Sequence, residues 1–342
     1  MADVTVMGAG IFGLSVAWAC AARGARVQVI DPHGPGAGAS GGVMGALAPH
    51  VPEQWNDKKA FQLDSLVMGA GFWAGVDAAS GLSSGYARTG RLQPIADEAA
   101  LQLARARGEG ARALWPDEFE WGVIPAEGEW APISATGFLI RDTLSARMNP
   151  RQASASLVGA ITARGGRVLS EGKPAGAVIW ATGVAGLEAL SAQHSRAVGN
   201  GVKGQGAVLR HSAPDLPQLF VDGVHVVPHE NGTVAVGSTS ERDYSDPHST
   251  DAQLDDVIAR ARQAVPILRD APVIERWAGL RPRSRSRAPM LGAHPTRTGE
   301  YIANGGFKIG FGMAPRVGAV MADLVLDGVD HIPAGFRPEA SY

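Results

Sequence analysis

Residues 4–13 read VTVMGAGIFG, and residues 27–31 read VQVID. The first stretch joins a short apolar run to three glycines spaced G-x-G-x-x-G, and the second is a short apolar run that ends in an acid. In this pattern Gly8 permits a tight turn, Gly10 lets the backbone approach a pyrophosphate, and Gly13 lets a helix pack closely on a strand. The stretch therefore predicts a strand, a turn, a helix and a second strand that together bind a dinucleotide.

The segment between the two runs has helical periodicity. Its expected buried face consists of Leu14, Ala17, Trp18 and Ala21. Gly24 is placed to end this helix in a left-handed conformation. Asp31 closes the second strand, where its carboxylate can accept the hydroxyls of an adenosine ribose and would repel a 2′-phosphate, so NADP is disfavoured.

The composition sets outer limits on the class of protein. The chain has 342 residues, 45% of them hydrophobic, and a formal net charge of −2. This length suggests about two domains, and the charge gives no reason to expect a nucleic-acid partner. We find no leader-like segment and no apolar run near the ~18 residues of a membrane helix, so we expect a cytoplasmic protein without membrane partners. Cys20 is the single cysteine, which excludes internal disulfides and a cysteine metal cluster, and we expect no metal.

Periodicity predicts further elements along the chain. Helices are expected over residues 57–78, 97–114, 150–164, 251–265 and 314–326. Strands are expected over residues 167–169, 177–180 and 301–303, and an antiparallel sheet over residues 206–236. Two further small-residue stretches, 34–45 and 181–183, indicate places where the backbone passes close to another group.

Seven motifs follow one another along nearly the whole chain. They are GAGIFG at 8–13, AS at 39–40 with Gly45 and Pro49, ATG at 181–183, VKGQ at 202–205, VP at 227–228 with VGST at 236–239, WAGLRP at 277–282, and GFKIG at 306–310. In these motifs and their order the chain resembles the FAD-dependent D-amino-acid oxidase family, and within it bacterial glycine oxidase and its sarcosine-oxidase-like relatives.

The resemblance implies an α/β fold with two domains. A Rossmann-like FAD-binding domain of the glutathione-reductase type would comprise residues 1–82, 144–200 and 280–342. An α+β substrate domain, built on a mixed or antiparallel sheet, would comprise residues 83–143 and 201–279. One departure is that Ser170–Gly176 is too short for the strand meander that relatives insert there.

The resemblance also implies a non-covalently bound FAD. Its expected contacts are Gly8, Gly10, Ile11, Phe12, Gly13, Asp31, Ala39, Ser40, Gly45, Ala181, Thr182, Gly183, Gly305, Gly306, Phe307, Lys308, Ile309 and Gly310. A helix starting near Ala314 would aim its positive end at the loop 305–310, where N–H groups can stabilise negative charge on the reduced flavin.

Arg281, His225 and Lys308 are the expected substrate and catalytic residues. In relatives the arginine of the WAGLRP block holds the substrate carboxylate, which a guanidinium matches with two parallel hydrogen bonds. His225 stands where glycine oxidase has a tyrosine, and its titration near neutral pH would make binding pH-dependent. Lys308 stands where glycine oxidase has an arginine near the entrance. Plain structural or surface roles remain open for each, as for Lys203, expected in a turn where a cation could assist oxygen.

The expected reaction is oxidation of glycine, sarcosine or a D-amino acid by hydride transfer from the α-carbon to flavin N5, giving an imine that hydrolyses. The small amine would be one partner, and oxygen or another acceptor the second. Two alternatives stay open: a larger amine such as carboxymethylaminomethyl-uridine in tRNA, or a flavin-binding protein without turnover. A homo-oligomer is also left open.

Overall fold

The opening stretch lies at the centre of a six-stranded sheet in the computed structural model, which describes residues 1–342. The strand order is β15-β16-β9-β1-β2-β8, and only β15 runs antiparallel to its neighbour. The strands are β1 (Val4–Met7), β2 (Val27–Ile30), β8 (Arg167–Leu169), β9 (Ala177–Trp180), β15 (Met290–Ala293) and β16 (Tyr301–Asn304). The strand-turn-helix-strand unit predicted from residues 4–31 is therefore confirmed.

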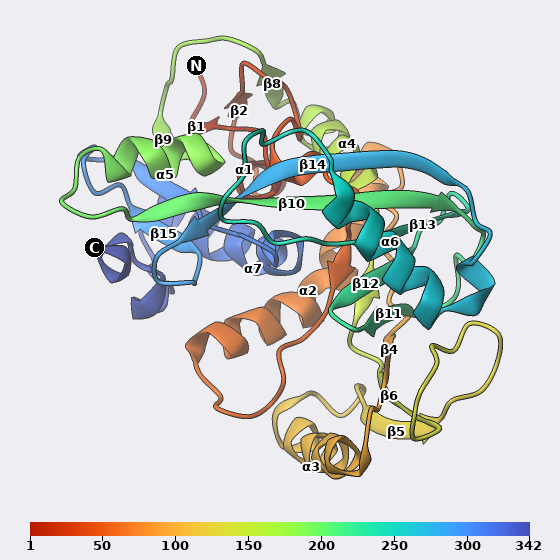
Figure 1. The fold of residues 1–342 in the computed structure, drawn as a ribbon. Coiled ribbons are helices and arrows are strands. Elements are labelled where there is room, and N and C mark those ends of the chain that lie inside the picture. The colour runs from red at the N-terminus through yellow and green to blue at the C-terminus, as the bar shows by residue number, and fades with distance from the viewer.

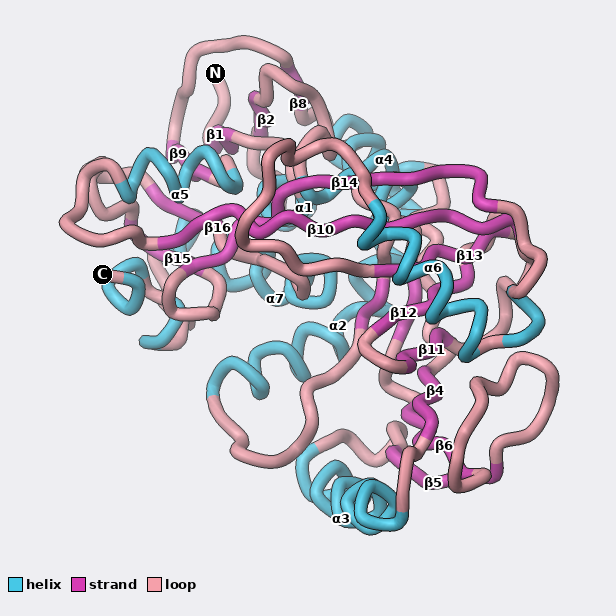
Figure 2. The backbone as a smooth tube through the Cα atoms, in the orientation of Figure 1, coloured by secondary structure: helices cyan, strands magenta, loops and turns pink.

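Helices α1 (Ile11–Ala22), α2 (Asp57–Ser80), α4 (Pro150–Ala163) and α7 (Gly310–Ala322) pack against one another beside this sheet (Figure 2). Helix α1 is buried on nearly all sides, and Gly24 follows it with φ +88° as predicted. The apolar side chains of these helices and of β1 and β2 form the largest hydrophobic core. None of the helices combines the length and the apolar character that crossing a bilayer requires.

The prediction that the last helix starts near Ala314 is wrong, because α7 begins at Gly310. Glycine has a low helix propensity. Because residues 310 and 312 are glycines, the sequence alone predicts that residues 310–312 lie outside the helix. In the structure Met313 is fully buried, and a Cβ on Gly312 would lie 3.5 Å from Leu66 of α2. Burial of the first turn against α2 thus overrides propensity and extends the helix by one turn.

A mixed eight-stranded sheet forms the second part of the molecule, in the order β14-β10-β13-β12-β11-β4-β6-β5. Only β11 and β4 are parallel neighbours. The strands are β4 (Arg91–Pro94), β5 (Trp121–Pro125), β6 (Phe138–Asp142), β10 (Gly199–Arg210), β11 (Gln218–Val221), β12 (Val224–Pro228), β13 (Thr233–Gly237) and β14 (Val273–Ser284). Helix α6 (Ala252–Ala264) packs on β10, β12 and β13, and α3 (Glu98–Leu114) packs on β5 at the end of the molecule away from the N-terminus (Figure 1).

The long ribbon of β10 and β14 runs across the molecule from α5 (Gly183–Ser191) towards β13. Sequence periodicity identified only the C-terminal end of β10, from Gly206 onward, and did not identify β14. Strand β14 carries charged residues and a proline rather than an alternating pattern. Lys203 was expected in a turn, which is wrong, since it lies within β10 opposite Leu280.

The remaining connections are short. A two-stranded ladder joins β3 (Ala46–Leu47) to β7 (Ala146–Arg147). No strand lies between β8 and β9, so the absence of a meander over Ser170–Gly176 is confirmed. The two sheets draw on the segments assigned to the two domains, except that β10 begins at Gly199 and β14 continues through Ser284. The domain boundaries themselves stay a prediction.

A buried ion pair in the second sheet offers a test of its stability. Arg91 Nε lies 2.9 Å from Asp142 Oδ2, and both side chains are buried. We expect Asp142→Asn to lower the free energy of unfolding by about 3–5 kcal/mol, because Arg91 is left as an uncompensated charge. Urea unfolding of a double variant with Arg91→Met should recover part of this loss. Equal stability of Asp142→Asn and the wild type would contradict the burial of this ion pair.

Candidate active site

Three helices receive no cap from the side chain of their own N-cap residue, and their N-termini lie at the carboxyl ends of adjacent strands. Helix α1 follows β1, α5 follows β9, and α7 follows the loop after β16, and none of their N-cap residues caps through its side chain. The other four α-helices of the protein are each capped by an Asn or Asp side chain. Uncapped first turns retain free N–H groups, which attract anions.

Backbone contacts at the first turn explain its glycines. Gly8 has φ +110°, and a Cβ there would lie 2.4 Å from the carbonyl oxygen of Ala181. A Cβ on Gly13 would lie 2.0 Å from the carbonyl oxygen of Gly8. Beside Gly10 only the Ser40 hydroxyl lies nearby, 3.3 Å from the position of a Cβ. The same hydroxyl accepts a hydrogen bond from the N–H of Ile11 at 2.9 Å.

Asp31 lies at the end of β2, as predicted. Its carboxylate accepts hydrogen bonds from the N–H of Ala9 at 2.8 Å and of His33 at 2.9 Å. Each carboxylate oxygen therefore retains a further acceptor position, because a carboxylate has about four. Asp31 is thus anchored to the glycine turn and still fit to accept ribose hydroxyls.

The loop 305–310 contacts the starts of both α1 and α5. Cβ atoms on Gly306 and Gly310 would lie 2.9 Å from the Phe12 ring and 3.3 Å from the Ile11 side chain, respectively. Asn304 joins the loop to α5, because its side chain accepts from the N–H of Gly305 at 2.7 Å and donates to the carbonyl oxygen of Gly183 at 2.9 Å. Sequence reasoning did not select Asn304, although a buried polar residue directly before two glycines is a signal for such a role.

The residues present fit an extended FAD. The stretches 8–13, 181–183 and 305–310 come together at the carboxyl ends of the strands of the six-stranded sheet. They offer free N–H groups for a diphosphate and for an anionic ring edge. Gly45 has a separate explanation, because a Cβ there would lie 1.8 Å from the carbonyl oxygen of Met148. The individual cofactor contacts of Gly45 and of the other named residues stay predictions.

One face of the ribbon beside these stretches carries four glycines, which leave room for the side chains packed over them. Gly204 and Gly206 of β10, Gly237 of β13 and Gly279 of β14 share this face, since each is paired with the next across the strands. The Arg281 guanidinium lies directly over Gly204, where a Cβ would come within 2.0 Å of it. Arg281 Nη1 donates to the carbonyl oxygen of Thr239 at 3.1 Å.

His225 lies on the same face as Arg281, paired with Gly237. Its Nδ1 atom is buried and has no hydrogen-bond partner in the protein. Burial, reinforced by the charges of Arg91 and Lys308, lowers the pKa of His225 to about 3. The expectation that His225 titrates near neutral pH is therefore wrong, because it stays neutral there and can serve only as a neutral hydrogen-bonding group.

Lys308 is near both of these residues. It is exposed at the end of loop 305–310, and partial desolvation together with the charges of Arg281 and Arg283 lowers its pKa. The fold therefore places the three expected catalytic residues around one space, although they come from three distant segments. Their roles stay a prediction at this point.

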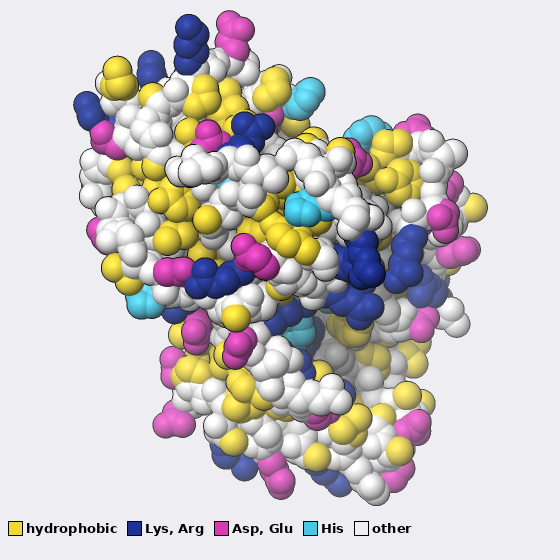
Figure 3. All heavy atoms as spheres, turned by 90° about the vertical axis from the view of Figure 1, so that its left-hand side faces the viewer, with side chains coloured by type: hydrophobic (Ala, Val, Ile, Leu, Met, Phe, Trp, Pro, Cys, Tyr) yellow, Lys and Arg dark blue, Asp and Glu magenta, His cyan; other side chains and the backbone are white.

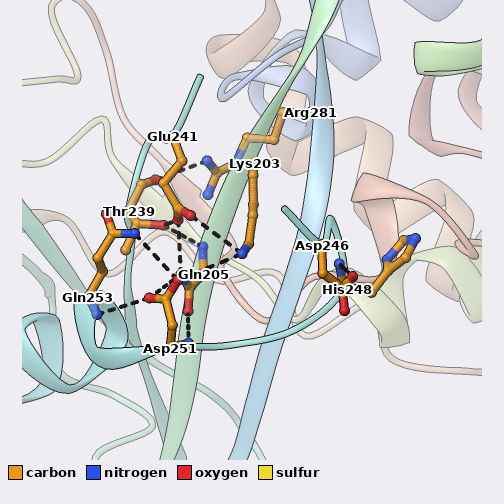
Figure 4. A network of polar contacts seen from close by, with 9 residues as sticks. All are labelled: Lys203, Gln205, Thr239, Glu241, Asp246, His248, Asp251, Gln253 and Arg281. Atoms are coloured by element: carbon orange, nitrogen blue, oxygen red, sulfur yellow. Dashed lines mark hydrogen bonds and ion pairs between the residues drawn. The ribbon is translucent and has the colours of Figure 1, made fainter. Parts of the chain in front are cut away.

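A polar network on the opposite face of the ribbon supports Arg281 (Figure 4). The Glu241 carboxylate accepts from the Thr239 hydroxyl and, at 3.0 Å, from the Gln205 amide, and lies 3.4 Å from Lys203 Nζ. Lys203 is thus buried in an ion pair. Burial lowers the pKa of Arg281 to about 10 and the Glu241 charge opposes this, so Arg281 is protonated at neutral pH. The network fixes the Thr239 carbonyl that orients the guanidinium.

A separate cavity of about 570 Å³ opens between residues 35–41 and α4. It is lined by Arg151 and Trp277 among others and does not reach Arg281. Arg151 there pairs with Glu275. The cavity borders the Ala39–Ser40 turn from outside and adds no group to the space around Arg281.

Comparison with known proteins identifies relatives of this chain. A family model described as "FAD dependent oxidoreductase" matches residues 3–324. The bifunctional protein ThiO/ThiG of Nostoc sp. is 29% identical over 95% of this chain and 53% of its own, so the chain spans about half the length of that relative. Glycine oxidase of Geobacillus kaustophilus is 24% identical over 94% of this chain and 92% of its own.

Solved structures share the fold. The crystal structure of glycine oxidase from Geobacillus kaustophilus has a TM-score of 0.84 at 22% identity, covering 98% of both chains. Iminodiacetate oxidase from Chelativorans sp. BNC1 gives the same TM-score, identity and coverage. The two-part α/β architecture expected from the sequence is therefore confirmed.

The glycine turn can be tested with two matched variants. Gly8→Ala introduces strain from positive φ and a clash with Ala181, whereas Gly24→Ala introduces positive-φ strain alone, since nothing lies within 4 Å of its Cβ position. We expect Gly8→Ala to weaken FAD binding at least tenfold in a fluorescence titration, and Gly24→Ala to leave it within twofold. Equal losses in both variants would contradict a cofactor role for the turn.

The low pKa of His225 predicts a pH dependence of stability. Between pH 6.5 and 3 the unfolded chain binds a proton at this residue and the folded chain does not, so the free energy of unfolding falls as the pH falls. Denaturant unfolding of His225→Gln from pH 6.5 to 4.5 should show a slope smaller by up to ~1.4 kcal/mol per pH unit. An unchanged slope in His225→Gln would show that this histidine is not buried in its neutral form.

Proposed function

The chain belongs to the family of FAD-dependent oxidoreductases, and on this premise we propose that it oxidises a small amine carrying a carboxylate, such as glycine, sarcosine or a D-amino acid. Full-length similarity to a glycine oxidase supports this substrate class. The observation that carries the proposal is the position of Arg281, a half-buried cation above a floor of glycines.

Arg281 has no carboxylate within ion-pair distance, so its charge is available to a ligand. A guanidinium stays charged when buried and binds a carboxylate through two parallel hydrogen bonds. Arg281 would therefore fix the substrate carboxylate and so orient the α-carbon.

FAD, when bound, supplies an acceptor for the hydride of the α-carbon, leaving an imine that water hydrolyses. The protein contributes orientation and electrostatics. His225 would offer its unpartnered neutral Nδ1 to the substrate. The N–H groups at the start of α7 and in loop 305–310 would favour negative charge at the ring edge beside them. Oxygen as the acceptor, a homo-oligomeric state and a cytoplasmic location stay predictions.

The test is anaerobic reduction of the purified, FAD-loaded protein. We expect a yellow protein whose flavin absorbance bleaches on addition of glycine, sarcosine, D-alanine or D-proline. A yellow protein that bleaches with none of a broad panel of amines would favour a flavin-binding role without turnover.

Two Arg281 variants separate charge from geometry. Arg281→Ala should keep the yellow colour and weaken binding of carboxylate substrates by ~2–5 kcal/mol, because a buried charge-assisted pair is lost. Arg281→Lys keeps the charge but not the two-pronged geometry, and we expect an intermediate KM with a smaller loss. Steady-state kinetics check both. Wild-type kinetics in Arg281→Ala would remove this residue from the substrate site.

A further inference from the structure

Positive side chains without acidic partners surround the approach to Arg281. This group, which we name the cationic entrance, consists of Lys58, Arg242, Arg283, Arg287 and Lys308. None of its members has a carboxylate within 4.0 Å, although the protein contains twelve such ion pairs elsewhere. Uncompensated charge of one sign at one place raises the local concentration of oppositely charged ligands.

Arg283 and Lys308 are held next to Arg281 by strand geometry and an aromatic ring. Arg283 follows Arg281 by two residues on β14 and so lies on the same face. Its guanidinium carbon lies 5.3 Å from the centroid of the Phe307 ring, and Lys308 Nζ lies 5.8 Å from the same centroid. Phe307 has φ +44°, and its N–H donates to the carbonyl oxygen of Pro282. This backbone hydrogen bond therefore fixes the position of the Phe307 ring, against which both cations lie.

The other members extend the positive charge to the surface. Lys58 Nζ donates to the carbonyl oxygen of Arg287 at 2.6 Å. The charges of Arg287 and Arg283 help to lower the pKa of Lys58. The charges of Arg287 and Arg242 help to lower the pKa of Arg283, so these groups are close enough for their charges to interact. Figure 3 shows lysine and arginine side chains gathered beside a hollow on this face of the molecule.

A substrate with one carboxylate would neutralise Arg281 and leave Arg283 and Lys308 unpaired. We infer that the substrate carries a second acid group, and that Arg283 and Lys308 bind this group while Arg281 holds the carboxylate next to the reacting carbon. This inference rests on the proposed function and narrows it to amino acids with an acid group on the nitrogen substituent or on the side chain.

The reaction leaves both acid groups unchanged. For an amine bearing two carboxymethyl groups, one α-C–H bond breaks, its hydride goes to FAD and the nitrogen lone pair forms the C=N bond. The nitrogen proton is released, and water then splits the imine into glyoxylate and glycine. The same electron balance holds for a D-amino acid with a side-chain carboxylate, which yields a 2-oxo acid and ammonia.

An RNA backbone is the competing ligand for a cationic surface. The structure favours a small dianion, because the cations lead inward to a half-buried guanidinium and the chain as a whole has 33 acidic against 31 basic residues. RNA binding is therefore an outcome that the test must be able to detect.

The experiment compares matched substrates on the FAD-loaded protein. Iminodiacetate and sarcosine differ by one carboxylate, as do D-aspartate and D-alanine. In anaerobic stopped-flow reduction we expect the second-order rate constant of flavin reduction to be at least tenfold higher for the diacid than for the monoacid in at least one pair. Raising NaCl from 20 to 300 mM should reduce this preference, since salt screens exposed charges.

Two variants assign the effect to the entrance. Arg283→Gln should lower kcat/KM for the diacid at least fivefold and for its monoacid partner less than twofold. Arg105→Gln, at an exposed position on α3, should change neither value. Equal preference for both acids in the wild type, or equal losses for both in Arg283→Gln, would overturn the inference while leaving the proposed function in place.

A binding measurement keeps the two proposals separable. Calorimetric titration with succinate and propionate, which cannot be oxidised as amines, should show tighter binding of succinate that depends on Arg283. If succinate binds in this way but no amine bleaches the flavin, the proposed function is overturned, whereas a diacid-binding site at the cationic entrance remains. A salt-sensitive gel shift with tRNA, combined with equal binding of the two acids, would overturn the inference in favour of RNA.

Discussion

The contact between the Gly8 turn and the backbone of Ala181 is the constraint on which the cofactor region depends. It holds the carboxyl ends of β1 and β9 against each other at a distance that only glycine allows. Helices α1 and α5 consequently begin side by side, and Asn304 adds the loop before α7. Three first turns that are not capped by their own N-cap residues thus face one region, which suits a diphosphate and an anionic ring edge.

The ribbon of β10 and β14 separates two kinds of chemistry by the alternation of its side chains. One face carries the glycines and Arg281, and the other carries Lys203 and Gln205 with their partner Glu241. The polar network therefore supports the arginine through the Thr239 carbonyl without occupying the substrate side. This division explains why Lys203 and Arg281, one strand apart, have different environments.

Local patterns in the chain were sufficient for much of the fold. The turn at residues 8–13, the acid at position 31 and the helix stop at Gly24 were predicted because each depends on neighbours within a few residues. The starting residue of α7 was predicted wrongly, since packing against α1 and α2 outweighs the low helix propensity of Gly310 and Gly312. Strand β14 was missed because it carries charged residues and a proline rather than an alternating pattern.

The sequence by itself determined the dinucleotide-binding unit and the identity of the candidate residues Arg281, His225 and Lys308. Only the tertiary structure decided that these three surround one space, that His225 stays neutral, and that Lys203 lies in an ion pair. The physical reason is the separation along the chain of the groups that interact. Turn geometry and capping act between near neighbours, whereas desolvation and charge coupling depend on groups that are distant in the chain and meet only when the two sheets are assembled.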